Sequence, residues 1–109
     1  MSKKSDEPVW SLVMFDLPVL TKVQRRQATQ FRKYLLDLGY QMAQLSVYVR
    51  YSPSTQSLVP TVNKIKRNVP PGGEVRILTI TDHQWVKALR FVNDESVEPA
   101  DVPQQLLIF

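Results

Sequence analysis

The sequence predicts an α+β fold in a single domain. Short apolar, β-prone runs alternate with amphipathic helical segments in the order strand, helix, strand or hairpin, helix, strand, strand. The chain of 109 residues is long enough for one domain with a modest core. This order is the βαββαβ pattern of ferredoxin-like domains with an added C-terminal strand. We divide the chain into a loose lead-in (1–8), a ferredoxin-like domain (9–92) and a C-terminal segment (93–109).

The first strand and the first helix have clear boundaries. The run VWSLVMF (Val9–Phe15) is apolar and β-prone, and the following Asp16-Leu17-Pro18 ends it because proline cannot donate to a strand ladder. Thr21 and Gln24 have the spacing of a capping box at the start of a helix, and Gly39 is well placed to close that helix.

This first helix is predicted to be apolar on one face and basic elsewhere. At 3.6 residues per turn, one face carries Ala28, Phe31, Tyr34, Leu35 and Leu38, which we expect to pack on the sheet. The opposite face carries Lys22, Arg26 and Lys33, with Arg25 and Arg32 on its flank. The helix therefore offers up to five cations to solvent.

The middle of the chain contains one strand or two, followed by a second helix. Tyr40–Tyr51 is β-prone and alternates, and it fits one long strand or two short ones joined by a bulge or tight turn near Gln44–Ser46. In this alternation Ser46, Tyr48 and Arg50 are expected on an exposed polar face. The second helix is expected to start near Ser57, since Pro60 suits its first turn. Its last turns carry Lys64, Lys66 and Arg67.

The remaining elements follow the break at Pro70-Pro71-Gly72-Gly73. We expect a strand at Glu74–Thr81, a turn at Asp82–Trp85 capped by Asp82, a short strand at Ala88–Val92, an acidic loop at Asn93–Pro103 and a terminal strand at Gln104–Phe109. A small domain with an open apolar sheet face favours a homodimer. The terminal strand (QQLLIF) either completes its own sheet or crosses to the partner, and we expect it to cross.

Composition and charge narrow the function classes. The chain has no cysteine, which excludes disulfides and cysteine zinc sites and fits a cytoplasmic location. It has no apolar run of membrane-spanning length and no signal peptide, so no membrane partner is expected. Residues 17–73 hold nine basic residues and one acidic residue, whereas residues 92–109 hold four acidic residues and no basic one. This pattern indicates a polyanion-binding face or two mutually attracting surfaces, unless it arose by chance.

Asp16 is the one candidate for metal chemistry. A carboxylate at a strand end can bind Mg²⁺, which assists phosphodiester cleavage. No second acid lies nearby in the sequence, and Asp37 is a full helix away. A two-fold dimer would supply the missing carboxylate from the second Asp16, but Asp16 could instead simply cap a turn or the helix. His83, the only histidine, is more typical of polar surface than of a general base.

The basic residues predict contacts to a nucleic-acid backbone. Such contacts are salt dependent and weakly sequence dependent. Aromatic residues are not interleaved with the basic ones, apart from Phe31 and Tyr34 on the face expected to be buried, which favours duplex over single-strand stacking. The candidate contact residues are Lys22, Arg25, Arg26, Arg32, Lys33, Arg50, Lys64, Lys66 and Arg67.

Four segments together resemble a known family. They are VMFDLP (13–18), TKVQRRQATQFRKYLLDLGY (21–40), QLSVYVR (44–50) and NKIKRNVPPGGEVRILTITDHQW (63–85). In this order they resemble the small CRISPR-associated spacer-acquisition proteins, the non-integrase partners of the CRISPR integrase, also known as endoribonucleases. The resemblance covers roughly Val9 to Val92, and the terminal QQLLIF is similar to the last strand of the family.

The resemblance implies a ferredoxin-like homodimer in which Asp16 matches the residue assigned to Mg²⁺ at the dimer interface. It also implies a dimer that bridges two integrase dimers and holds prespacer duplex DNA. Metal-dependent cleavage of RNA or double-stranded DNA is attributed to some members, so an enzyme is favoured although catalysis is not required for the main role. The family often has tyrosine where Phe15 stands, so one phenolic hydroxyl is missing here.

Three function hypotheses follow. The first is a dimeric DNA-binding subunit of the CRISPR adaptation complex. The second is a Mg²⁺-dependent endonuclease, acting on single-stranded RNA or double-stranded DNA through paired Asp16 carboxylates. The third, outside the family, is a ferredoxin-like toxin ribonuclease or small-ligand regulator, and the spread of cations over two helices disfavours a small-ligand sensor.

Overall fold

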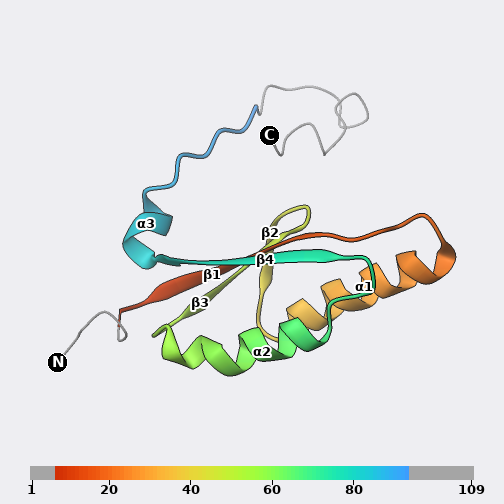
Figure 1. The fold of residues 1–109 in the computed structure, drawn as a ribbon. Helices are drawn as coiled ribbons and strands as arrows, with labels where there is room; N and C mark the ends of the chain where they lie inside the picture. Colours follow the sequence, from red (N-terminus) through yellow and green to blue (C-terminus); the bar gives the residue numbers. More distant parts are fainter. Residues whose placement is uncertain (1–6, 94–109) are drawn as a thin grey trace.

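The computed structural model describes residues 7–93 and has the predicted ferredoxin-like α+β fold. Its four strands form one antiparallel sheet in the order β2-β3-β1-β4, and Figure 1 shows α1 and α2 covering one face of it. The predicted acidic loop and terminal strand fall almost entirely beyond residue 93, so they and the crossing to a partner stay predictions. The elements are β1 (Val9–Asp16), α1 (Lys22–Asp37), β2 (Gln41–Gln44), β3 (Val47–Ser52), the 3-10 helix η2 (Gln56–Leu58), α2 (Val59–Arg67), β4 (Glu74–Thr81) and α3 (Asp82–Val86).

The core lies between the sheet and the two long helices. Alternate residues of β1 are buried, from Val9 to Phe15, and their neighbours face the open side of the sheet. From α1 the core takes Ala28, Phe31 and Leu35, and from α2 it takes Ile65. The predicted apolar face of α1 is thereby confirmed at these three α1 positions.

Local signals set the helix boundaries as predicted. Thr21 is the N-cap of α1: its Oγ1 accepts from Gln24 N at 3.0 Å, and Gln24 Oε1 accepts from Thr21 N at 3.0 Å. Gly39, at φ 94°, follows the last turn in the left-handed conformation that glycine tolerates. Pro60 lies in the first turn of α2, where its missing N–H costs no helical hydrogen bond.

The segment Tyr40–Tyr51 forms two strands, which decides the question that the sequence left open. A tight turn at Leu45 and Ser46 joins β2 to β3, with Ser46 at φ 64° and a register shift between Met42 and Gln44. Ser46 O also accepts a hydrogen bond from Phe15 N at 3.0 Å, which ties this turn to the end of β1.

The prediction that Tyr48 lies on an exposed polar face of its strand was wrong. Tyr48 pairs with Val13, whose side chain faces the helices, and it is only 4% exposed, whereas Arg50 is half-buried on the same face. Residues directly opposite in an antiparallel pair share a face, so the register decides the orientation. Val47 and Val49 face the open side instead, and because both sets contain apolar residues the alternation alone could not distinguish the two faces.

Two predictions for residues 82–92 were also wrong. The expected turn is the short helix α3, and its cap is Thr81, which forms a capping box with Gln84, rather than Asp82. Residues 88–92 form no strand within the part of the chain that the structure describes. Figure 1 shows α3 turning the chain away from the sheet, so these residues do not lie beside any of the four described strands.

Across residues 7–93, no helix combines the length and the apolar character that crossing a membrane requires.

Candidate nucleic-acid interface and carboxylate site

Asp16 ends β1 as an exposed carboxylate. Alternation places it on the open side of the sheet with Met14 and Leu12. It does not cap α1, since Thr21 does so, and it makes no hydrogen bond or ion pair with the other described residues. Capping of α1 therefore does not explain Asp16, and no described residue occupies its carboxylate.

A second carboxylate lies opposite Asp16. The pairing of β1 with β4 sets Asp16 against Glu74 and Met14 against Arg76. These side chains share the open side of the sheet and line, with Phe15, a shallow hollow of about 200 Å³. Glu74 Oε2 accepts from Arg76 Nη2 at 3.5 Å, a weak bond between exposed groups. No acid lies close to Asp16 in the sequence, as stated above, but the folded chain brings Glu74 opposite it.

The donor set fits a magnesium ion that retains water. Mg²⁺ prefers oxygen ligands and is commonly bound by one or two carboxylates with several waters. Asp16 and Glu74 supply two such groups in this chain. The described residues contain no group of three or more metal-ligating side chains.

Arg32 lies over the aromatic ring that precedes Asp16. Its guanidinium carbon is 5.7 Å from the centre of the Phe15 ring, within the range of a cation–π contact. The same ring packs against Phe31 and Tyr48, with centroids 5.3 and 5.6 Å away. Phe15 therefore packs in the core. Because it stands where the family often has tyrosine, this buried position carries no hydroxyl.

Arg25 and Arg50 are also bound within the chain. Arg25 Nη1 donates to the carbonyl oxygens of Val19 and Leu20 at 3.1 Å each, so it closes the connection between β1 and α1. Arg50 Nη1 donates to Thr61 Oγ1 at 2.7 Å and links β3 to α2. Each has an identified structural partner, and their predicted contacts to nucleic acid stay predictions.

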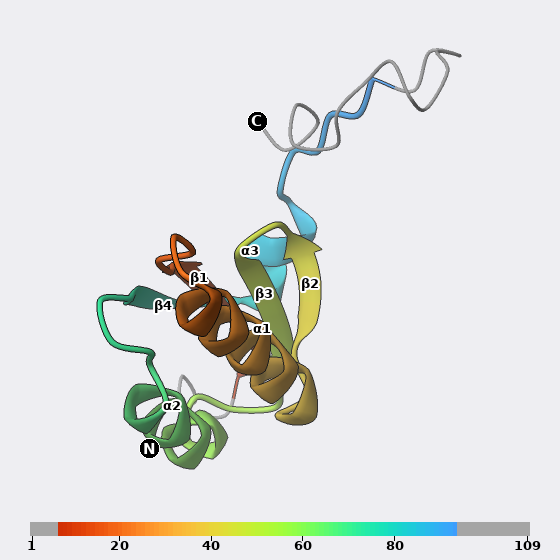
Figure 2. The same ribbon diagram turned by 90° about the vertical axis from the view of Figure 1, so that its right-hand side faces the viewer.

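The other six predicted contact residues are exposed and make no hydrogen bond or ion pair with the described residues. All six belong to α1 or α2, on the side of the sheet that these helices cover (Figure 2). They are Lys22, Arg26 and Lys33 on α1 with Lys64, Lys66 and Arg67 on α2, and we call them the basic helix layer.

The connections that precede α1 and follow α2 touch at Gly73. A Cβ added there would lie 2.6 Å from Leu17 Cδ2 and 3.1 Å from Pro70 O, closer than side chains normally pack. Gly73 N also donates to Pro70 O at 3.0 Å. Glycine suits this close approach, because a side chain here would have to displace the end of Leu17 and would crowd Pro70 O.

The fold and these charged groups define a ferredoxin-like α+β protein with a carboxylate pair at one end of its open sheet face and cations over its helices. The sequence model of the family described as CRISPR associated protein Cas2 matches residues 9–88. The chain belongs to this CRISPR-associated family, which confirms the resemblance found in its motifs.

Individual relatives agree with this assignment. The CRISPR-associated endoribonuclease Cas2 of Paracidovorax avenae is 42% identical over 102 residues, which cover 93% of this chain and 94% of the relative. The protein of the same name from Parvibaculum lavamentivorans is 39% identical over 101 residues, covering 93% and 100%. The crystal structure of Streptococcus pyogenes Cas2 at pH 6.5 is similar in fold, with a TM-score of 0.59 and 19% identity over 77% of this chain and 99% of that chain.

Sequence reasoning missed Glu74 and Arg76 as neighbours of Asp16. The signal was only partly available, because the sequence predicted strands at Val9–Phe15 and Glu74–Thr81, and only the structure extends the first to Asp16, so that both have eight residues. If two antiparallel strands of equal length pair end to end, the last residue of one meets the first of the other. The internal partners of Arg25 and Arg32 had no comparable signal, since they depend on the path of the connection and on a ring in another element.

Proposed function

We propose that this protein is a dimeric nucleic-acid-binding subunit of the CRISPR spacer-acquisition complex, which bridges integrase dimers and holds prespacer duplex DNA. The observation that carries the proposal is the basic helix layer, six exposed cations on two helices of one face, unpaired among the described residues. Cations in such a layer neutralise phosphates and release counterions, so they bind a duplex without reading its sequence.

The open face of the sheet supports the dimer. Across from the helices, β1, β3 and β4 present apolar side chains, of which Tyr51 and Leu78 are about half exposed, at 50% and 51%. Apolar surface of this kind marks an interaction site, and a second copy of the chain would cover it. A dimer joined through this face turns its two helix layers outward, and each is then available to nucleic acid.

Binding to a labelled blunt DNA duplex at several salt concentrations tests the proposal. We expect Arg26→Glu with Lys33→Glu to weaken binding at least about tenfold and to reduce the slope of log K against log salt by about 2. The matched control is Lys87→Glu with Arg90→Glu, the same change in charge outside the layer. An equal loss in both pairs would assign the effect to net charge and contradict a specific layer.

The bridging role is tested with the full chain and the integrase purified together. We expect a stable complex that binds a short duplex and contains two copies of this chain. Deleting residues 104–109 should give monomers in analytical ultracentrifugation if the terminal strand crosses to the partner. An unchanged dimer after this deletion would remove the crossing strand from the proposal but leave the open face as the interface.

The second candidate is a Mg²⁺-dependent endonuclease that uses Asp16 of both chains. It is favoured by the free carboxylate beside Glu74 and by the name endoribonuclease, which the relatives carry. Asp16, with Glu74 beside it, would hold the ion, and a bound divalent ion polarises a phosphodiester. The chain's own contribution is Arg76, a cation that lines the same hollow and would meet the scissile phosphate beside these carboxylates.

Cleavage assays on single-stranded RNA and double-stranded DNA, with Mg²⁺ or with chelator, test this candidate. We expect Asp16→Asn to reduce cleavage at least about 100-fold and Asp37→Asn, a carboxylate at the far end of α1, to leave it unchanged. Cleavage that persists in Asp16→Asn would identify a contaminating nuclease. Duplex binding by the same variant distinguishes loss of this activity from loss of the scaffold.

A further inference from the structure

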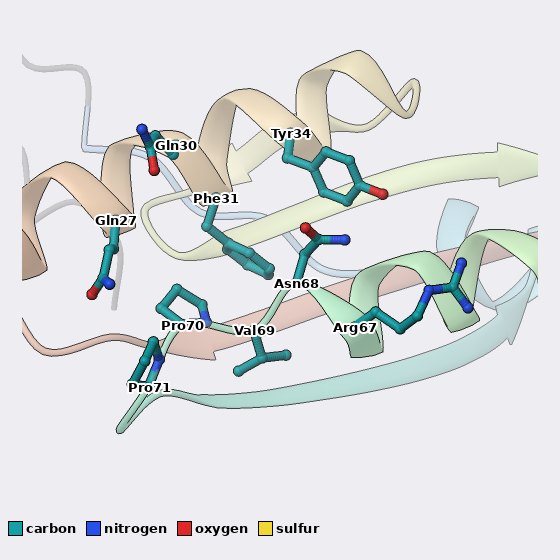
Figure 3. Close-up of a pocket in the computed structure, with 9 residues that line it drawn as sticks. All are labelled: Gln27, Gln30, Phe31, Tyr34, Arg67, Asn68, Val69, Pro70 and Pro71. Carbon is teal, nitrogen blue, oxygen red and sulfur yellow. The ribbon is translucent and has the colours of Figure 1, made fainter.

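A groove lies between α1 and the connection from α2 to β4. Figure 3 shows the nine residues that line it, and its volume is about 390 Å³. From α1, Phe31 points towards Asn68 and Pro70, and the ring of Tyr34 extends along the groove above Arg67. Pocket volumes of this order accept small organic ligands.

The lining combines flat surfaces with hydrogen-bonding groups. Tyr34 is only half-buried, so part of its ring is open to a ligand, and the prolines add apolar surface. Gln27, Gln30 and Asn68 bring carboxamides, each of which both donates and accepts. Asn68 Nδ2 already donates to Lys64 O at 2.8 Å, which fixes its orientation and leaves its carbonyl oxygen as an acceptor.

The charge of the groove favours an anion. Arg67 is the cation among the described lining residues, and none of them is acidic. Lys64, an exposed member of the basic helix layer, precedes Arg67 by one turn of α2, and its carbonyl oxygen accepts from Asn68. An anionic ligand would therefore meet favourable potential from the end of α2.

We propose that this groove binds one unpaired nucleotide of a single-stranded nucleic acid, with its base against Tyr34 and its phosphate at Arg67. A base offers the flat ring that an aromatic face binds, and its edge matches the carboxamides. Tyr34 was expected on the buried face of α1, and it is half-buried, so part of its ring is open to such a base. The inference deepens the proposed function, on whose basic helix layer it rests: the layer binds duplex, and the groove adds a site for unpaired strand.

Substitutions at Tyr34 separate stacking from general binding. Tyr34→Leu removes the ring and Tyr34→Phe retains it, and each is measured with a labelled single strand and with the blunt duplex. We expect Tyr34→Leu to weaken single-strand binding about 5- to 150-fold and to leave duplex binding unchanged, since one stacked base is lost. Tyr34→Phe should bind like wild type. Equal losses on both nucleic acids, or no loss on either, would overturn the proposal.

A charge substitution provides a second test that does not touch the core. Gln30→Glu places an anion in the groove on an exposed side chain, and Gln56→Glu makes the same change on η2, outside it. We expect only Gln30→Glu to weaken single-strand binding, by at least about fivefold. If both variants bind alike, the groove takes no part.

Crosslinking then locates the site. A single strand carrying one photoreactive base should crosslink to residues 27–34 or 67–71, and free mononucleotide should reduce the yield. Crosslinks confined to other segments would overturn the proposal. So would displacement by the acidic peptide DESVEPADVPQQLLIF (94–109) but not by mononucleotide, since that result assigns the groove to a peptide. Duplex binding by the variant Arg26→Glu with Lys33→Glu tests the proposed function alone, so its result does not bear on the groove.

Discussion

The two ends of β1 differ sharply on the open face of the sheet. At the first end Trp10 stacks on Trp85, with centroids 5.0 Å apart, and meets the edge of Tyr51 at 5.6 Å. Its indole Nε1 also donates to Asp82 Oδ1 at 2.7 Å. At the other end Asp16 is exposed, without a hydrogen bond to the described residues, and faces Glu74. One strand thus joins an end stabilised by an aromatic cluster to an end with two carboxylates opposite each other.

The largest effect should come from disrupting the aromatic cluster. Trp10→Ala removes the stack, the edge contact and the hydrogen bond, so we expect the free energy of unfolding to fall by about 2–4 kcal/mol. Urea denaturation measures this change. Leu89→Ala, at a side chain that is 84% exposed, is the control and should change stability by less than about 0.5 kcal/mol. A loss below about 1 kcal/mol for Trp10→Ala would show that the aromatic cluster contributes little.

A smaller loss of stability is expected from a buried hydrogen bond on the helix-covered face of the sheet. Ser11 Oγ and Tyr40 Oη are 2.8 Å apart in a buried hydrogen bond. Tyr40→Phe leaves the serine hydroxyl without this partner and should cost about 1–2 kcal/mol. Tyr51→Phe removes a hydroxyl that makes no hydrogen bond with the described residues, and it should be nearly neutral.

The Tyr40 hydroxyl also predicts a dependence on alkaline pH. Burial raises the pKa of Tyr40 above its ordinary value of 10.0, although the Ser11 hydrogen bond and the Arg50 charge lower it in part. The unfolded chain releases this proton near pH 10, whereas the folded chain holds it to higher pH. The free energy of unfolding should therefore fall as pH rises above about 10, and Tyr40→Phe should lack this component. Equal slopes in both proteins would contradict the prediction.

The smallest effect is expected at the carboxylate end. Asp16 and Glu74 are like charges directly opposite each other, an arrangement that destabilises a strand pair. Without metal, Asp16→Asn should raise the free energy of unfolding by up to about 0.5 kcal/mol. The gain should vanish in a Glu74→Gln background, which a double-mutant cycle measures. A lower free energy of unfolding in Asp16→Asn would contradict this prediction and would show that the Asp16 carboxylate stabilises the fold.

The sequence predicted the elements better than their partners. Capping by Thr21, the buried stripe of α1 and the position of Pro60 follow from local chemistry, so the chain shows them directly. The face of Tyr48 depends on its pairing with Val13, and the neighbour of Asp16 depends on the pairing of β1 with β4. Register is a property of two segments, and no single segment reveals it.

The candidate site was predicted unevenly for the same reason. Asp16 could be found because a charge at the end of an apolar run is visible along the chain, and the six cations of the basic helix layer could be found from helical periodicity. Arg25 and Arg32 share that periodicity, yet one closes a connection and the other covers Phe15. Periodicity shows which side of a helix a cation occupies, but the surrounding connections decide what it contacts.

The contact at Gly73 links the two surfaces to which we assign ligands. Leu17 follows Asp16 directly, and Pro70 lines the groove, so both surfaces border on Gly73. A side chain introduced at Gly73 would therefore press on a neighbour of each surface, on Leu17 beside the carboxylates and on Pro70 in the groove. A substitution at Gly73 is therefore expected to affect the carboxylate end and the groove together, and a smaller side chain at position 17 would relieve the contact with Leu17.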